Sequence, residues 1–320
     1  MLDQLILTIP QPRPTLALDQ LIARNDVLGY FAAFLVSCKV EGLLPASINS
    51  YKGLAGEFVK YLSRVGVSDP KQITASHVRM FILLKQQTCN PVSVHTYYRH
   101  TKRFINWMVS EGILEKSPMT TIKPPRMPKT MVKPFNVTDL RTLLSLCDSE
   151  TFLGARNKAI ILLFIDTGLR LAELTNIQLP DIDFDRGIIK VMGKGARERI
   201  VHISQNTQKA IFNYLMKRTE KLPGLWVTQE RTPLRYWGVV QMVKRLGQKA
   251  NLQGVRCSPH TFRHTAATLS LESGALEFEV QSMLGHSTLT MTRRYVSSIN
   301  SEKAAEAHKR FSPVKNLNLA

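Results

Sequence analysis

The 320-residue sequence predicts a mainly α-helical protein of two domains, the second of which carries a small antiparallel β-sheet. Three observations support this fold class. Apolar residues recur at helical spacing through both halves, a proline-rich basic segment lies at 116–134, and a glycine-centred hairpin pattern lies at 187–203. The length is sufficient for two domains that each bury a core.

The first half predicts a short tail followed by a helical domain. Residues 1–17 combine an apolar stretch with three prolines and are expected to form the tail. From 18 to 115 the apolar positions follow helical spacing, with breaks at Pro70 and Asn90-Pro91, which predicts about four helices. Ser47 is the expected N-cap of one of them.

The second half begins at Phe135, where helical periodicity resumes. Thr138 is the expected N-cap of a helix through Leu146, and Gly168 is expected to end an apolar helix over 157–166. Strands at 187–192 and 197–203 flank the turn Gly193-Lys194-Gly195-Ala196. The remaining helices are expected at 206–221, 234–250, 259–273, 277–284, 288–297 and 300–309.

The balance of charge is the most unusual feature of the composition. Lys and Arg number 43 against 24 Asp and Glu, which gives a formal net charge of +19. Such an excess favours a polyanionic partner, because each phosphate neutralised by Lys or Arg releases condensed counterions. The alternative is a set of solvated basic faces. Nucleic acid is therefore the expected partner.

Cysteine spacing and the lack of long apolar runs indicate a reducing compartment. Four cysteines lie far apart and form no Cys-x-x-Cys pair, so neither disulfides nor a zinc site is expected. No apolar run is long enough to span a membrane, and the N-terminus lacks a signal-peptide pattern. We therefore expect a cytoplasmic, nucleoid-associated protein that needs no metal or other cofactor.

Two basic segments are candidates for contacts with the DNA backbone. The last helix of the first domain mixes aromatic residues with Arg99, Lys102 and Arg103, which suits a helix laid along DNA or a solvated face opposite a core stripe. Lys123, Arg126 and Lys129 lie in the segment 116–134, where prolines favour extended geometry. This linker could cross a DNA backbone as a basic strap.

Several residues of the second half suit phosphodiester chemistry. Such chemistry without a metal needs a nucleophile, cations for the non-bridging oxygens and an acid for the leaving oxygen. Arg170 follows a helix break, Lys194 lies at the hairpin tip, and His260 and Arg263 share one face of a helical turn. His286 and Tyr295 follow in one segment. Each residue alone has an ordinary structural explanation.

In combination, these segments resemble the tyrosine recombinase family of phage integrases and Xer-type recombinases. The resemblance rests on TGLRLAEL, the GKG hairpin with Arg197 and Arg199 after it, PHTFRHTAAT and LGHSTLTMTRRY. These motifs occur in family order over about 166 to 296 and fill all six positions of the family's active set: Arg170, Lys194, His260, Arg263, His286 and Tyr295. Ala172 departs from the pattern, since a small Ser is frequent there.

The resemblance implies a two-domain DNA clamp. A SAM-like core-binding domain would span 18–115, a linker 116–134 and a catalytic domain 135–299, with 300–320 docking on a neighbouring protomer. Arg197 and Arg199 would be further DNA contacts. The family layout also implies a tetramer on two paired sites, with accessory proteins in some systems.

The resemblance also implies a role for each active-set residue. Tyr295 would attack the scissile phosphate, forming a 3′-phosphotyrosine. Arg170 and Arg263 would hold the non-bridging oxygens with help from His286. Lys194 would protonate the 5′-oxygen and His260 would accept the tyrosine proton. Strand exchange through a Holliday junction would then need no ATP.

Three alternatives stay open at this point. A DNA-binding regulator of the same fold that no longer cuts is disfavoured by the complete active set. A type IB topoisomerase shares the chemistry, but a core-binding domain and a C-terminal tail suit tetramer assembly better. A metal nuclease is least favoured, since no cluster of carboxylates accompanies the basic residues.

Overall fold

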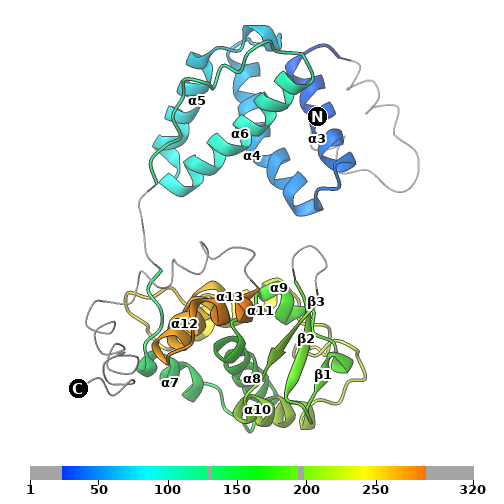
Figure 1. Cartoon of the computed structure of the whole chain (residues 1–320), viewed down its shortest axis with the longest axis vertical. Coiled ribbons are helices and arrows are strands. Elements are labelled where there is room, and N and C mark those ends of the chain that lie inside the picture. The colour runs from blue at the N-terminus through cyan, green and yellow to red at the C-terminus, as the bar shows by residue number, and fades with distance from the viewer. Residues whose placement is uncertain (1–23, 128–131, 194–197, 286–320) are drawn as a thin grey trace, which may run out of the picture. The chain divides into compact units, whose positions relative to one another are not determined.

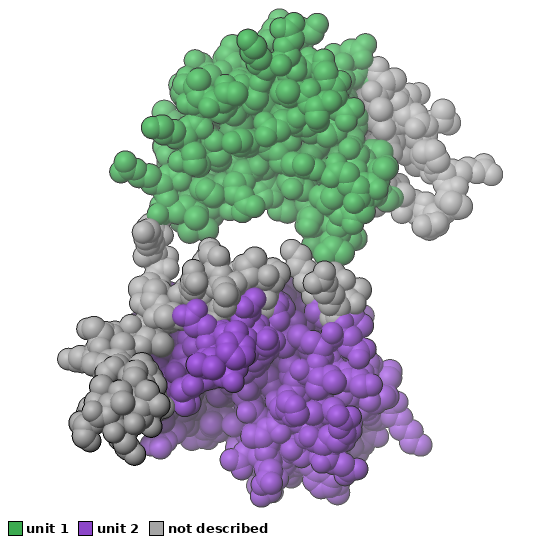
Figure 2. All heavy atoms as spheres, viewed as in Figure 1, with its two compact units in different colours: residues 1–130 green, residues 131–320 purple. Residues whose placement is uncertain are grey.

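The computed structural model describes residues 24–127, 132–193 and 198–285 (Figure 1). The chain divides into two compact units, Met1–Thr130 and Met131–Ala320, which Figure 2 shows in different colours. Each unit has its own hydrophobic core.

The regular elements of unit 1 are all helical within the described residues, as the periodicity predicts. Its α-helices are α3 (Val27–Val40), α4 (Pro45–Arg64), α5 (Ala75–Thr88) and α6 (Pro91–Ser110), with a 3-10 turn at Pro70–Gln72. Helix α4 packs against both α3 and α6 (Figure 1). Aromatic rings fill the space between them: Phe31 meets Phe104 edge to face, with ring centroids 5.2 Å apart.

Two expectations for unit 1 are wrong in detail. Helix α4 begins at Pro45 with Leu44 as N-cap, so Ser47 lies inside the helix; proline at the first position needs no donor and sets the helical φ. The expected extended linker starts later than residue 116, because Met119 is buried in the core of unit 1 and Ile122 packs beside it. Tyr98 Oη also donates a hydrogen bond to the Ile122 carbonyl at 2.8 Å. Apolar side chains among the prolines thus keep this segment folded back on the helices.

Unit 2 contains helices and a small antiparallel sheet, as expected. The helices are α7 (Val137–Ser145), α8 (Phe152–Thr167), α9 (Leu171–Thr175), α10 (Gln205–Met216), α11 (Tyr236–Lys249), α12 (Pro259–Glu272) and α13 (Glu277–Leu284), with a 3-10 turn at Leu179–Asp181. Helix α8 packs between α10 and α12. The sheet has the order β1 (Ile182–Asp183), β2 (Ile188–Met192), β3 (Glu198–His202), all antiparallel.

The sheet keeps the predicted hairpin and adds a short strand. Ile188 pairs with His202 and Met192 with Glu198, so β2 and β3 form the two arms of the predicted hairpin. Ile189 and Val191 face the core, whereas Lys190 and Met192 are exposed. The sequence does not predict strand β1, because two residues are too few to show the alternation typical of a strand.

Several helix ends differ from the expected ones. Asn136, and not Thr138, caps α7: its side chain accepts from Asp139 N at 2.7 Å, and both residue types can cap. Helix α8 begins at Phe152, five positions before the expected residue 157, after the Thr151 cap. Helix α10 ends at Met216, before the expected residue 221. Helix α13 has its predicted bounds, and the helices expected at 288–297 and 300–309 lie outside the described residues.

None of the helices in the described ranges is both long and apolar enough to cross a membrane. Within those same ranges, no group of three or more His, Cys, Asp or Glu side chains is placed to hold a metal ion. All four cysteines are free thiols.

Candidate active site

Two helices of unit 2 end at glycines, and the first of these glycines lies against the end of the second helix. Gly168 ends α8 with φ +59° and Gly285 ends α13 with φ +63°, so both take the left-handed conformation that favours glycine. A Cβ on Gly168 would lie 2.5 Å from Leu284 Cδ2, so a side chain there would force the Leu284 side chain to shift. The carbonyl groups at these two helix ends need hydrogen-bond donors from elsewhere in the fold.

Arginines supply those donors. Arg263 of α12 is 5% exposed and donates from Nη1 to the Gly168 carbonyl at 2.6 Å and from Nη2 to the Leu284 carbonyl at 2.8 Å. Arg170, just before α9, donates from Nη2 to the Gly285 carbonyl at 2.8 Å. Positive charge at a helix C-terminus is favoured by the helix dipole. The two predicted phosphate-binding arginines are therefore brought to neighbouring carbonyls of one helix end.

A buried carboxylate orients Arg170. The Glu173 side chain is 2% exposed; its Oε1 accepts from Arg170 Nη1 at 2.8 Å and its Oε2 from the Arg170 backbone N–H at 2.7 Å. Arg199 Nη2 donates to the same Oε2 at 2.9 Å. Burial alone would raise the pKa of Glu173, but the Arg170 N–H and the Arg199 charge outweigh it and hold the pKa below its usual value. Glu173 thus contacts the guanidinium groups of both Arg170 and Arg199.

Arg170, His260 and Arg263 line one cleft of about 890 Å³. Lys133 and Arg256 lie on its wall, and no described residue that lines it is acidic. The exposed rings of Tyr236 and Trp237 also line the cleft. Such a cationic, partly apolar cleft suits a phosphodiester with its sugar and base.

His260 lines this cleft from the start of α12. It lies in the first turn of α12, after the Ser258 cap that accepts from Thr261 N at 3.2 Å. Loss of solvation around its ring lowers the pKa of His260, and the charge of Arg263 lowers it further. A lowered pKa keeps the imidazole neutral near pH 7, which is the form that takes up a proton. His264, by contrast, is buried and contacts Thr268, as expected of a structural residue.

Comparison with known proteins identifies the family of the chain. Residues 135–302 match the family model described as the phage integrase family. The chain belongs to this family. Tyrosine recombinase XerC of Myxococcus xanthus is 30% identical over 263 residues, which cover 80% of this chain and 88% of that protein. XerD of Listeria monocytogenes serotype 4b is 28% identical over 299 residues, covering 90% and 99%.

Solved structures of tyrosine recombinases share the fold. XerH site-specific recombinase bound to a palindromic difH substrate matches with a TM-score of 0.71 at 20% identity, over 89% of this chain and 86% of that one. A lambda integrase dimer bound to a COC′ core site matches with a TM-score of 0.70 at 15% identity, over 84% and 95%. The predicted family and fold class are confirmed.

Three of the six residues predicted to form the active set lie outside the described residues: Lys194, His286 and Tyr295. Gly193 is the first residue after β2, and Lys194 directly follows it. His286 directly follows Gly285, whose carbonyl Arg170 holds. The structure therefore describes the residues directly before Lys194 and His286.

The predicted DNA contacts that the structure describes divide into two groups. Arg99, Lys102, Lys123 and Arg126 are exposed, and so is Arg103, which pairs with Glu41 at 2.7 Å. The Arg199 side chain is only 16% exposed, because it donates to Glu173 and to the Met283 carbonyl. Lys129 and Arg197 lie outside the described residues.

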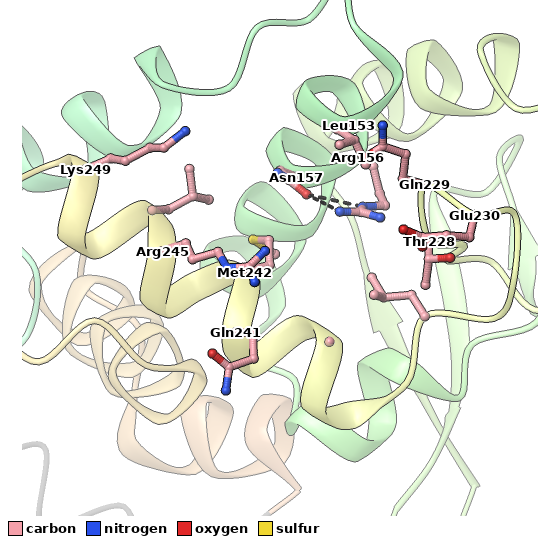
Figure 3. Close-up of a pocket in the computed structure, with 13 residues that line it drawn as sticks. Leu153, Arg156, Asn157, Thr228, Gln229, Glu230, Gln241, Met242, Arg245 and Lys249 are labelled. Atoms are coloured by element: carbon pink, nitrogen blue, oxygen red, sulfur yellow. Dashed lines mark hydrogen bonds between the residues drawn. The ribbon is translucent and has the colours of Figure 1, made fainter.

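A second hollow of unit 2, of about 430 Å³, lies between α8, α11 and the loop at 228–230 (Figure 3). Arg156 on its wall is 6% exposed and donates to Asn157 Oδ1 at 2.9 Å and to the Val227 carbonyl at 2.8 Å. None of the described active-set residues lines this hollow. Arg156 therefore ties α8 to the loop and has no part in the cleft.

Tyr236 and Trp237 are residues of the cleft that sequence reasoning missed. Their local pattern does not differ from that of aromatic residues in a helical core. One signal was available: the stretch from Arg231 to Leu271, which contains both rings, His260 and Arg263, has no Asp or Glu. An acid-free run of this length in an otherwise mixed domain indicates a surface that meets phosphate.

Proposed function

We propose that this recombinase catalyses site-specific recombination of duplex DNA, cutting and rejoining strands through a 3′-phosphotyrosine on Tyr295 and a Holliday junction. One observation carries the proposal. Arg170 and Arg263 donate to adjacent carbonyls at the end of α13 and share an acid-free cleft with His260. That arrangement presents two guanidinium groups and a neutral base to one phosphate.

The proposed reaction is a transesterification in which every proton has a donor and an acceptor. The Tyr295 oxygen bonds to phosphorus while His260 takes its proton, and the bond from phosphorus to the 5′-oxygen breaks while Lys194 supplies a proton. Arg170 and Arg263 neutralise the non-bridging oxygens, with His286 adding a hydrogen bond. Because Glu173 and the helix-end carbonyls already fix the two arginines, little reorganisation is needed in the transition state.

The partner assignments are part of the same proposal. Duplex DNA is the substrate, with backbone contacts from Arg99, Lys102, Arg103, Lys123, Arg126, Lys129 and Arg197. A core-binding domain in unit 1 and a catalytic domain in unit 2 form the clamp, and four protomers assemble on two sites with residues 300–320 docking on a neighbour. The exposed basic side chains of α6 support the first part of this assignment.

Covalent trapping on a nicked suicide duplex tests the proposal. The DNA would carry the site selected by the native chain from a random duplex library, and the reaction would contain EDTA. We expect a denaturation-resistant protein–DNA adduct with the native chain and none with Tyr295→Phe. Tight binding without an adduct would favour a non-cutting regulator.

Strand exchange is measured separately. We expect the native chain to join two duplexes that each carry the selected site. Relaxation of supercoiled DNA without exchange would indicate a type IB topoisomerase instead.

A further inference from the structure

Arg199 connects three segments of unit 2 that lie far apart in the sequence. It lies on β3, donates from Nη2 to Glu173 at 2.9 Å and donates from Nη1 to the Met283 carbonyl, 84 residues away in the sequence. Glu173 in turn orients Arg170, so one guanidinium links the hairpin strand, the start of α9 and the end of α13.

Gly285 lies against the same guanidinium. A Cβ on this residue would be 3.0 Å from Arg199 Nε and 3.1 Å from Cδ, so the arginine packs directly over the glycine. The Gly285 carbonyl also accepts from Arg170 Nη2 at 2.8 Å. The turn at which α13 ends is therefore held by Arg199 and by Arg170 together.

We infer that Arg199 is a positioning residue, which holds Glu173 and the end of α13 in the geometry that aims Arg170 at the scissile phosphate. This inference rests on the proposed function. It replaces the expected DNA contact of Arg199, because Arg199 does not line the cleft that Arg170 and Arg263 share, and both of its Nη atoms donate to protein groups. A planar guanidinium reaches two acceptors at fixed angles, which a lysine ammonium on its flexible stem does not reproduce.

Removing Arg199 displaces Arg170 without removing a phosphate contact. Glu173 loses one of its two cationic partners and the Met283 carbonyl loses its donor. A displacement of about 1 Å in a catalytic group can cost on the order of 10²-fold in rate. The affinity for DNA and its dependence on salt should stay at their native values, since the number of neutralised phosphates is unchanged.

The test compares two scissile groups. Adduct formation in a single turnover would be measured on a nicked duplex with an ordinary phosphodiester and on one with a neutral methylphosphonate at the scissile position. The neutral group depends less on the arginine pair, because it has lost one charged non-bridging oxygen. For Arg199→Ala we expect a slowing of about 10- to 100-fold on the phosphodiester and a clearly smaller one on the methylphosphonate.

Two further variants calibrate this result. Arg170→Ala should show the same pattern with a larger loss, and Arg199→Lys should lie between Arg199→Ala and the native chain. Equal slowing of Arg199→Ala on both substrates would overturn the inference. So would a weaker affinity with a salt slope reduced by about 1, which is the mark of a lost phosphate contact.

Arg218→Ala is the matched control. The Arg218 side chain is enclosed in the same unit and donates to the carbonyls of Leu222, Gly224 and Leu225, none of which belongs to the cleft. This variant should lower the melting temperature but keep the native ratio of rates on the two substrates. A changed ratio would mean that any loss of a buried arginine produces the effect, and would overturn the inference.

A crystal structure of Arg199→Ala tests the role independently of cleavage. We expect Arg170 to lose its contact with the Gly285 carbonyl; an unchanged Arg170 would overturn the inference. Absence of an adduct with the native chain on either substrate would contradict the proposed function instead, and would leave the crystal structure as the test of Arg199.

Discussion

The arginine cluster of unit 2, formed by Arg170, Arg199 and Arg263, and the basic face of α6 in unit 1 hold positive charge in different ways. Every arginine of the cluster donates to a helix-end carbonyl, and two of them also donate to the buried Glu173. On α6, Arg99 and Lys102 are exposed to solvent. Charge that is fixed in place suits the stabilisation of a transition state, whereas mobile surface charge suits binding.

The largest effect is expected from Arg263→Ala. The substitution removes one of the two guanidinium groups from the cleft and leaves the Gly168 and Leu284 carbonyls without these donors. Cleavage in a single turnover on saturating DNA should fall on the order of 10²- to 10³-fold. Affinity for the same DNA should change far less. A loss confined to affinity would mean that Arg263 only binds, as the surface residues do.

Glu173→Gln should slow cleavage by about 10- to 100-fold, because the cluster loses the charge that orients it. The variant also makes a prediction for pH. The folded pKa of Glu173 lies below its ordinary value of 4.5, so its contribution to stability is complete above pH 4.5 and is lost as the pH falls through the folded pKa. The difference in melting temperature between the native chain and Glu173→Gln should therefore shrink on acidification below pH 4.5. A constant difference would contradict the ionised state of Glu173.

Protonation of His260 should determine how the cleavage rate falls at acidic pH. Its pKa is lowered by loss of solvation and by Arg263, so the neutral imidazole persists to a pH below 6.5. The midpoint of the acidic limb in single-turnover cleavage should lie below 6.5, and His260→Ala should abolish that limb along with most of the rate. Arg263→Lys is the control for the charge next to His260: it keeps that positive charge, so the midpoint should stay below 6.5 in this variant as well. A midpoint above 6.5 would argue against His260 as the proton acceptor.

The sequence predicts individual elements of the cleft better than their convergence. Ser258-Pro259 marks the start of α12 and Gly285 the end of α13, since a cap and a left-handed glycine act locally. Local chemistry does not decide whether Asn136 or Thr138 caps α7, because either side chain can cap a helix. The contact from Arg199 to the end of α13 joins residues 84 positions apart and has no local signal. For that reason sequence reasoning assigned Arg199 to the DNA, together with the truly exposed basic residues.

The smallest effect is expected from the basic face of α6, where neighbouring residues differ in their partners. Lys102→Ala should weaken binding modestly and reduce the slope of log affinity against log salt by about 1, with no change in cleavage on saturating DNA. Arg103 forms an ion pair with Glu41 at 2.7 Å, so a phosphate would compete with that carboxylate for the guanidinium. Arg103→Ala should therefore cost less affinity than Lys102→Ala, and Glu41→Gln should strengthen binding. Equal effects of the two alanine variants would mean that the ion pair opens freely on DNA, as a surface pair of small net energy can.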